Sequence, residues 1–358
     1  MIEFLVIGLA AAIMLVLWKS RLNYIFLPTL PVIPNAPEPD LTVIIPARNE
    51  AHQIARVVKS FPNLPVIVVD DASSDNTSEL AFQAGARVIP APPLPPKQKG
   101  KPNACAEGAR HATTKWILFV DADTWFDPSF ASNLVAYAES AHLQFVTVFL
   151  EQVCETLSEK ALLPYAFALY FTGVSARAVN NLKSREALAN GQCVLFERVV
   201  YNSIGGHSAV ADSVIEDVAL ARHAKKSGIP VRVIRAETLG HVRMYEGFSA
   251  IWRGFQKNSF RFLVINPWSG LQVILASILL TSWLPVLLLG LTDSPRLSLA
   301  PTPVMILFFS SFLSLLPWYR NWRVLLAPFA IYLFQLIALN GMLVTLTRRP
   351  TLWKNRHV

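Results

Sequence analysis

The sequence predicts an α/β domain with a Rossmann-like, mostly parallel sheet, combined with transmembrane helices. Short apolar runs alternate with helical stretches in the first third of the chain, as in a sheet covered by crossover helices. Long apolar runs lie at both ends of the chain. The mean hydropathy of +0.39, with 53% hydrophobic and 16% charged residues, is too apolar for an ordinary soluble enzyme.

The charge and the cysteines narrow the class further. The formal net charge is +8, and the basic residues cluster mainly beside apolar segments. This pattern fits an anionic membrane surface better than nucleic acid, so no nucleic-acid partner is expected. Cys105, Cys154 and Cys193 are isolated in the sequence, which argues against a zinc site or a disulfide framework and agrees with a reducing compartment.

Residues 1–18 predict a retained transmembrane anchor. The apolar run is followed at once by Lys19 and Arg21, and the start of the chain lacks the positive charge of a signal peptide. We therefore expect a multi-pass protein of the cell (inner) membrane, with its amino end outside and the following domain in the cytoplasm. Residues 19–40, rich in proline, are predicted to be a linker.

The first predicted strands are 41–46 and 65–70, each an apolar run bounded by turn residues, with helical stretches after Asn49 and Asn76. No G-x-G-x-x-G follows the first strand, so a dinucleotide cofactor is not expected.

Polar clusters follow both strands. The first strand ends in PARNE (46–50) and the second in DDASSDNT (70–77). Strand-end aspartates can accept from a nucleobase N–H or a ribose hydroxyl, whereas Asp75 and Thr77 are ordinary helix-start residues. Asp70 and Asp71 are therefore the better ligand candidates.

The stretch WILFVDADTWFD (116–127) reads as a buried central strand that ends in Asp121 and Asp123. Ligands of open α/β sheets bind at this edge of the sheet. The two carboxylates can point at one Mg²⁺ or Mn²⁺, which would hold a diphosphate. The alternative is a strand-end aspartate that caps the next helix.

The segment 90–104 is rich in proline and lysine. A solvated linker is one interpretation. However, Lys97, Lys99 and Lys101 precede or begin the helix that leads to the DAD strand, and Lys101 is our candidate for contacting a diphosphate.

Four motifs, VIIPARNE, VVDDASSDNT, GKPNACAEGA and FVDADTWFDP, together resemble the nucleotide-sugar half of family-2 glycosyltransferases with the GT-A fold, over roughly residues 40–260. The resemblance implies a catalytic domain over 41–245, with a nucleotide-sugar half (41–127) and an acceptor half (128–245). It implies that Asp70 or Asp71 contacts the nucleobase and ribose. It also implies that Asp121 and Asp123 hold the metal and the diphosphate of the donor, with a UDP-sugar favoured over a GDP-sugar. The expected donor-binding residues are Pro46, Arg48, Glu50, Asp70, Asp71, Lys101, Asp121, Asp123 and Arg243.

The acceptor half contains NGQ (190–192), a predicted strand (193–198) and VIEDVAL (214–220). By resemblance to the family, Asp217 is the general base, and Gly191, Gln192 and Glu216 lie on the acceptor side. A carboxylate opposite the diphosphate would deprotonate an acceptor hydroxyl during back-face attack, which inverts the anomeric configuration. The alternative is that Glu216 and Asp217 only begin a helix.

Residues 246–268 are predicted to form an amphipathic interfacial helix, with Arg253, Lys257 and Arg261 on its basic face. The Q-x-x-R-W motif of processive members is absent, since QKNSF occupies 256–260. RMY (243–245) and IWRGFQKN (251–258) more closely resemble the branch that glycosylates carotenoids or other polyisoprenoid lipids.

Residues 269–347 predict about three further spans, at 271–291, 304–316 and 324–346. Four spans in all would leave the basic tail (348–358) outside, whereas its charges favour the inside. We attribute this conflict to the short segment 304–316, which would then be re-entrant or tilted rather than a full span.

The sequence therefore predicts a membrane-bound, metal-dependent, inverting glycosyltransferase that uses Mg²⁺ or Mn²⁺. Its acceptor would be a membrane lipid such as a carotenoid, a hopanoid or another polyisoprenoid. A processive polysaccharide synthase is the alternative, and an inactive membrane scaffold is the second alternative. The full set of Asp70, Asp71, Asp121, Asp123 and Asp217 is present, which argues against the scaffold.

Overall fold

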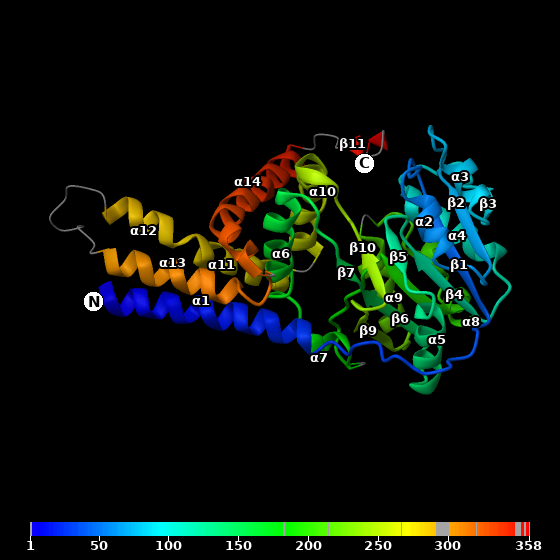
Figure 1. Ribbon diagram of the computed structural model, residues 1–358, viewed down its shortest axis with the longest axis horizontal. Helices are drawn as coiled ribbons and strands as arrows, with labels where there is room; N and C mark the ends of the chain where they lie inside the picture. Colours follow the sequence, from blue (N-terminus) through cyan, green and yellow to red (C-terminus); the bar gives the residue numbers. More distant parts are fainter. Residues whose placement is uncertain are drawn as a thin grey trace.

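The computed structural model describes the whole chain except residues 1, 182, 214, 266, 291–300, 320, 348–351, 354–355 and 358. It has two parts that lie side by side along the long axis (Figure 1). One is an α/β domain and the other is a group of helices. The amino end of α1 lies at the end of the helical part that is remote from the α/β domain, whereas the strands β11 (Leu352–Trp353) and β12 (Arg356–His357) lie at the end nearer to that domain.

The α/β domain is built on a seven-stranded sheet of order β3-β2-β1-β4-β8-β6-β9. All neighbouring strands are parallel except β8, which is antiparallel to β4 and β6. A smaller sheet has the order β5-β10-β7. The predicted mostly parallel sheet is confirmed. The strands of the large sheet are β1 Leu41–Ala47, β2 Val66–Asp70, β3 Arg87–Pro90, β4 Trp116–Val120, β6 Phe145–Phe149, β8 Cys193–Glu197 and β9 Val231–Arg235, and those of the small one are β5 Thr124–Phe126, β7 Glu151–Gln152 and β10 Gly240–Val242.

Helices cover both faces of the large sheet. Alternate residues of β1 enter opposite cores: Val43 and Ile45 face one side, and Ile44 faces the other. Helix α4 packs so closely on Ile44 that a Cβ at Gly108 would overlap that side chain. The helices of this domain are α2 Ile54–Lys59, α3 Thr77–Gln83, α4 Gly100–His111, α5 Phe130–Ser140, α7 Ala176–Val179, α8 Arg198–Ser203, η1 Gly206–Val210 and α9 Glu216–Lys226.

The predicted anchor is a longer helix than the sequence indicated, since α1 spans Ile2–Ile25. The segment after it is bound to the sheet edge. The Leu30 N–H donates to the Arg235 carbonyl (2.7 Å), and the Arg235 N–H donates to the Pro28 carbonyl (2.8 Å). Residues 28–30 thus run as a short extended segment that pairs, through Thr29, with Arg235 at the end of β9.

Helix α6 (Leu157–Tyr170) belongs to the helical part, although it lies in the middle of the sequence (Figure 1). The Ser20 hydroxyl of α1 donates to the Ala168 carbonyl (2.6 Å). Side chains of α6 share a buried apolar cluster with α1, α11 and α14. The predicted domain boundary at residue 245 did not anticipate this excursion.

Among the residues that the structure describes, three helices are long and apolar enough to cross a membrane: Phe4–Ile25, Trp268–Leu288 and Trp322–Leu346. The suspected short segment is a shorter apolar helix, Thr302–Leu315. The side chains of Lys257 and Arg261, and those of the basic tail, lie outside the described part of the chain. The elements of this part are α10 Gly247–Ile265, α11 Pro267–Thr281, α12 Trp283–Gly290, α13 Pro301–Leu315, η2 Asn321–Leu326, α14 Ala327–Leu346, β11 Leu352–Trp353 and β12 Arg356–His357.

Candidate active site

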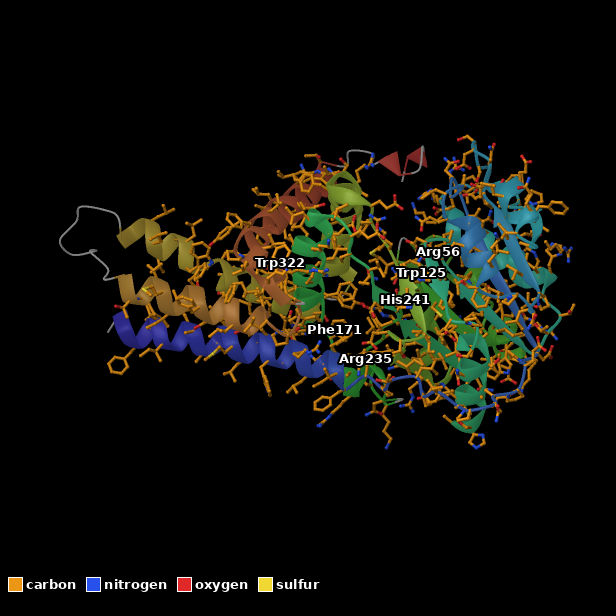
Figure 2. The ribbon with its side chains drawn as sticks, in the orientation of Figure 1. Arg56, Trp125, Phe171, Arg235, His241 and Trp322 are labelled. Atoms are coloured by element: carbon orange, nitrogen blue, oxygen red, sulfur yellow. The ribbon has the colours of Figure 1, made fainter. Side chains whose placement is uncertain are left out.

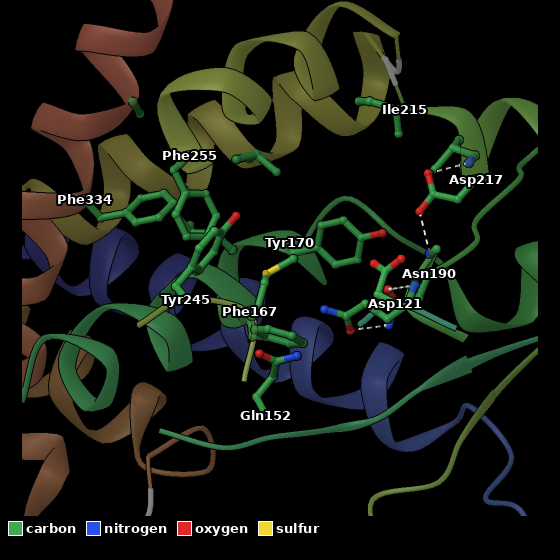
Figure 3. Close-up of a pocket in the computed structure, with 18 of the residues that line it drawn as sticks. Asp121, Gln152, Phe167, Tyr170, Asn190, Ile215, Asp217, Tyr245, Phe255 and Phe334 are labelled. Atoms are coloured by element: carbon green, nitrogen blue, oxygen red, sulfur yellow. Dashed lines mark hydrogen bonds between the residues drawn. The ribbon is translucent and has the colours of Figure 1, made fainter. Parts of the chain in front are cut away.

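One large cavity, of about 1400 Å³, joins the two parts of the molecule. Its α/β end lies at the carboxyl ends of β1 and β4, where Asp121 is found. Its other end lies among α10, α11, α12 and α14. Figure 3 shows the transition, with Asp121 and Asp217 on one side and Phe255 and Phe334 on the other.

The turn after β4 presents Asp121 and Asp123 to this cavity. The Asp121 N–H donates to the Gln192 carbonyl (3.1 Å), and the Thr124 hydroxyl donates to the Asp121 carbonyl (2.7 Å). The Arg243 N–H donates to the Asp123 carbonyl (3.2 Å). Contacts with Gln192, Arg243 and the neighbouring Thr124 therefore fix the backbone that carries both carboxylates.

Lys101, in the first turn of α4, lies between two acidic groups. Its Nζ is 2.6 Å from Asp121 Oδ1 and 3.3 Å from Glu216 Oε1, and it also donates to the Gly191 carbonyl (3.3 Å). Burial alone would lower the pKa of Lys101, but the Asp121 and Glu216 carboxylates raise it well above its ordinary value. Lys101 therefore stays positively charged, and its Nζ lies beside Asp121 of the DAD turn.

Asp217, in the first turn of α9, lies in the cavity wall next to Glu216. Its Oδ2 accepts from the Gly191 N–H (2.7 Å). A Cβ at position 191 would lie 3.2 Å from both Asp217 Oδ2 and Lys101 Nζ, so glycine allows this close approach. Burial, and then the neighbouring Glu216 charge, raise the pKa of Asp217 well above that of an ordinary aspartate.

The ends of β1 and β2 supply Pro46, Arg48, Glu50 and Asp71 to the cavity. The Arg48 guanidinium donates to the Asp71 carbonyl and lies 3.9 Å from its carboxylate. Asp70 has a different place: its Oδ1 accepts from the Ser73 N–H (3.3 Å), and Asp70 is not among the described residues that line the cavity. The structure thus brings Asp71, rather than Asp70, to this space.

Arg243 is not among the cavity-lining residues that the structure describes. Its guanidinium pairs with Glu155 (2.7 Å) and with the buried Glu159 (3.2 Å). This cluster joins β10 to the start of α6, and the Gly247 N–H of α10 also donates to Glu159 (2.8 Å). The predicted donor contact of Arg243 therefore stays a prediction, while the structure gives this side chain a positioning role.

Beside this cluster, Arg56 lies over the Trp125 ring, 3.2 Å from its centroid, and His241 stacks on the same ring (Figure 2). His207 is buried among aromatic rings and contacts the Tyr201 hydroxyl (2.9 Å). Burial lowers its pKa to about 3, so it remains neutral at physiological pH. His207 and His241 therefore both contact packed aromatic side chains, which indicates structural roles for them.

Aromatic residues in the middle of the cavity were not predicted from the sequence. They come from four separate elements and from the loop before α10, which only the fold brings together. In Figure 3, Tyr170 lies between the carboxylates and the rings of the helical part. A possible signal was the dense aromatic content of the stretch that forms α6. The aromatic residues are Phe149, Phe167, Tyr170, Tyr245, Phe255, Tyr332 and Phe334.

Asp121 and Asp123 fit a magnesium or manganese ion by the chemistry of their oxygens. The described residues contain no group of three or more His, Cys, Asp or Glu side chains placed to hold a metal. A Mg²⁺ ion bound with a nucleotide needs fewer protein ligands, since one or two carboxylates suffice when phosphate oxygens and waters complete its shell. The pair therefore suits a cation that arrives with a diphosphate.

Comparisons with known proteins agree with this architecture. Residues 42–204 match the family described as Glycosyl transferase family 2. The chain is 29% identical over 231 residues to 4,4'-diaponeurosporenoate glycosyltransferase of Staphylococcus aureus (strain USA300), covering 61% of this chain. It spans 60% of the length of that relative, and the same figures apply to strain Newman.

The fold is similar to that of the mannosyltransferase PcManGT from Pyrobaculum calidifontis, solved in complex with GDP-Man and Mn²⁺. The TM-score is 0.55 at 18% identity, and the match covers 98% of this chain and 100% of the other. The sheet topology, the DAD turn and the family match lead to one conclusion. The α/β domain has a GT-A-like fold in which residues 42–204 match the Glycosyl transferase family 2 model, and it is attached to apolar helices that are long enough to cross a membrane.

Proposed function

We propose that the protein is an inverting glycosyltransferase that moves a sugar from a nucleotide-sugar donor to a membrane lipid. The proposal rests on a cavity that has two different ends. The Asp121, Lys101 and Asp217 cluster lines one end, and helices that are long and apolar enough to cross a membrane line the other. A polar donor and an apolar acceptor need these two environments within reach of one another. The S. aureus relative, whose name specifies a glycosyltransferase of 4,4'-diaponeurosporenoate, supports a carotenoid or related polyisoprenoid acceptor.

On the donor side, Asp121 and Asp123 would hold Mg²⁺ or Mn²⁺ with the diphosphate. When bound, the ion would neutralise the charge of the leaving nucleoside diphosphate. Lys101 already neutralises Asp121 at 2.6 Å and would provide a second positive charge at the phosphates. Asp71, Arg48 and Glu50 line the same end of the cavity and are the proposed nucleoside contacts. The UDP-sugar preference stays a prediction.

On the acceptor side, Asp217 would act as the general base. A base is most effective when its pKa lies near the working pH, and the pKa of Asp217 is raised in that direction. It would take the proton from the acceptor hydroxyl, or hold an acceptor carboxylate by hydrogen bonding when protonated. The oxygen would then attack the anomeric carbon opposite the leaving diphosphate. The Gly191 N–H orients the Asp217 carboxylate at 2.7 Å.

We further propose that the α/β domain and the tail lie in the cytoplasm at the inner membrane. Lys19 and Arg21 follow the apolar core of α1 at the end near the α/β domain, which agrees with the positive-inside rule. The strands β11 and β12 lie at the end of the helical part that is nearer to the same domain in Figure 1. Reporter fusions at the carboxyl end test this topology: an active cytoplasmic reporter agrees with it, and an active periplasmic or external reporter contradicts it.

The thermal stability of the detergent-purified protein tests the donor side. A ligand that binds only the folded protein raises its unfolding midpoint. The nucleotides compared are UDP, GDP, TDP and CMP. We expect one of the three diphosphates to raise the midpoint, and only when Mn²⁺ or Mg²⁺ is present. Asp123→Ala is expected to abolish that metal-dependent rise. The absence of any shift under all these conditions would contradict the proposal.

A further inference from the structure

The helical end of the cavity is lined by one face of each of two neighbouring membrane-type helices. On α11 and α12 the lining positions Ile274, Ile278, Thr281, Pro285 and Leu288 recur at spacings of four and three residues. This spacing marks a single helical stripe that continues across the break at Ser282.

Helix α14 presents a matching stripe. Its lining positions Tyr332, Gln335, Leu339 and Met342 recur at spacings of three and four residues. The Tyr332 hydroxyl donates to the Thr281 carbonyl (2.8 Å), which joins α14 to the end of α11. The two stripes therefore border the same space.

Several side chains that line the cavity on α11, α12 and α14 are also exposed on the surface of the protein. Ile278 is 60% exposed, Leu288 58% and Leu336 57%, although all three line the cavity. Residues that combine both properties lie where a cavity opens to the outside. In helices that would be surrounded by lipid, such an opening faces hydrocarbon rather than water.

The route from this opening to Asp217 passes aromatic rings. Phe334 packs against Phe255 (4.9 Å between centroids), and Phe255 packs against Tyr245 (5.4 Å). Beyond these rings, Tyr170 lies next to the carboxylate end in Figure 3. Such walls favour contact with a flat or extended apolar chain.

We infer that the acceptor enters sideways from the bilayer between α11–α12 and α14, with its reactive end leading and its apolar chain left between these helices. This inference rests on the proposed function and specifies the substrate class: a lipid with one extended apolar chain and a terminal hydroxyl or carboxyl group. We assign the opening to the acceptor because it is continuous with the cavity that Asp217 lines.

Tryptophan substitutions at lining positions test the route, and the chain offers matched controls. Ile278→Trp and Leu336→Trp place bulk at the opening. Leu275→Trp on α11 and Leu343→Trp on α14 place the same bulk at residues that are 51% and 56% exposed and are not among the described lining residues.

The acceptor would be a polyisoprenoid carboxylic acid in phosphatidylglycerol vesicles, compared with a short, water-soluble acid of the same terminal group. We expect the lining variants to raise KM for the long acceptor by about tenfold or more, with little change in kcat. Their nucleotide-dependent thermal shift and their use of the short acid should stay as in the native protein. Lining variants that behave like their controls would overturn the route.

Photolabelling provides a readout that does not need turnover. A polyisoprenoid acid with a diazirine along its chain should label the native protein around Ile278 and Leu336, and the long unlabelled acid should compete. Labelling confined to other helices would overturn the route, even if sugar transfer to lipid succeeds. Failure of the metal-dependent nucleotide shift would instead contradict the proposed function.

Discussion

Two carboxylates in this protein have pKa values that are shifted in opposite directions. Glu159 is fully buried where α6 meets the α/β domain, and its pKa falls to about 2. Asp217 lies in the cavity wall, and its pKa rises. Burial raises the pKa of both groups, so the difference comes from their neighbours.

Glu159 is surrounded by donors. It accepts from the N–H groups of Glu155, Thr156 and Gly247, from the Thr156 hydroxyl and from the Arg243 guanidinium. Asp217 accepts from the N–H groups of Gly191 and Val218 and lies next to the negative Glu216. A carboxylate with many donors holds its charge and stabilises a junction, whereas one beside another carboxylate is suited to taking a proton.

The largest expected effect is that of Asp217→Asn. The amide keeps the shape of the side chain but cannot act as a base, so sugar transfer to a hydroxyl acceptor should fall by about 10²- to 10⁴-fold. Because the pKa of Asp217 is raised, its ionised form costs stability at high pH. The thermal midpoint at pH 8 should therefore be unchanged or higher. Transfer at the native rate would contradict the assignment of Asp217 as the base.

Replacing Glu159 should have the opposite outcome. Glu159→Ala leaves Arg243 without its buried partner and should lower the free energy of unfolding by about 3–5 kcal/mol. The thermal midpoint in detergent measures this loss. The control is Glu155→Gln, because Glu155 also pairs with Arg243 but is 61% exposed; its cost should be below about 1 kcal/mol. Equal losses for the two variants would contradict a special role for the buried junction.

The pH dependences of activity and stability should differ for the same reason. With an acceptor that reacts through a hydroxyl group, transfer should rise with pH through the raised pKa of Asp217, well above the ordinary aspartate value of about 4, and should fall about tenfold per pH unit below it. The stability that Glu159 contributes is present above the ordinary glutamate pKa of about 4.3 and is lost as pH falls toward about 2. Rate profiles and thermal midpoints over the same pH range check both. If activity and stability fell together, unfolding would explain the rate loss.

A smaller effect is expected from Gly191→Ala. The added Cβ would lie 3.2 Å from Asp217 Oδ2 and Lys101 Nζ, so the base and its neighbour must shift by a few tenths of an ångström. Transfer should fall by about tenfold, while metal-dependent nucleotide binding should fall less, because the atoms nearest to the added Cβ belong to Asp217 and Lys101 rather than to the DAD turn. A parallel loss of nucleotide binding would show that Gly191 supports the donor end instead.

The sequence was informative wherever chemistry is carried by short segments at strand ends. The strand before Asp121, the turn of Asp123 and the start of α9 at Glu216 can each be identified from local pattern alone. Their meeting around Lys101 depends on sheet order, which local pattern does not specify. Arg243 illustrates the limit, because its pairing with Glu159 requires knowing that α6 leaves the α/β domain.

The part of the cavity wall that the apolar helices form was harder to predict from the sequence, for a related reason. Hydropathy identifies helices such as α14, but it does not say which face of a helix lines a cavity. Phe167, Phe255 and Phe334 lie far apart in the sequence and line one wall only after α6, α10 and α14 have packed together.

The anomeric configuration of the product tests the central claim most directly. A single back-face displacement assisted by Asp217 must give a glycolipid whose anomeric configuration is opposite to that of the donor sugar. Proton NMR coupling constants of the purified glycolipid, compared with those of the donor, measure this. Inversion is the predicted result, and a product that retains the donor's configuration would contradict the account.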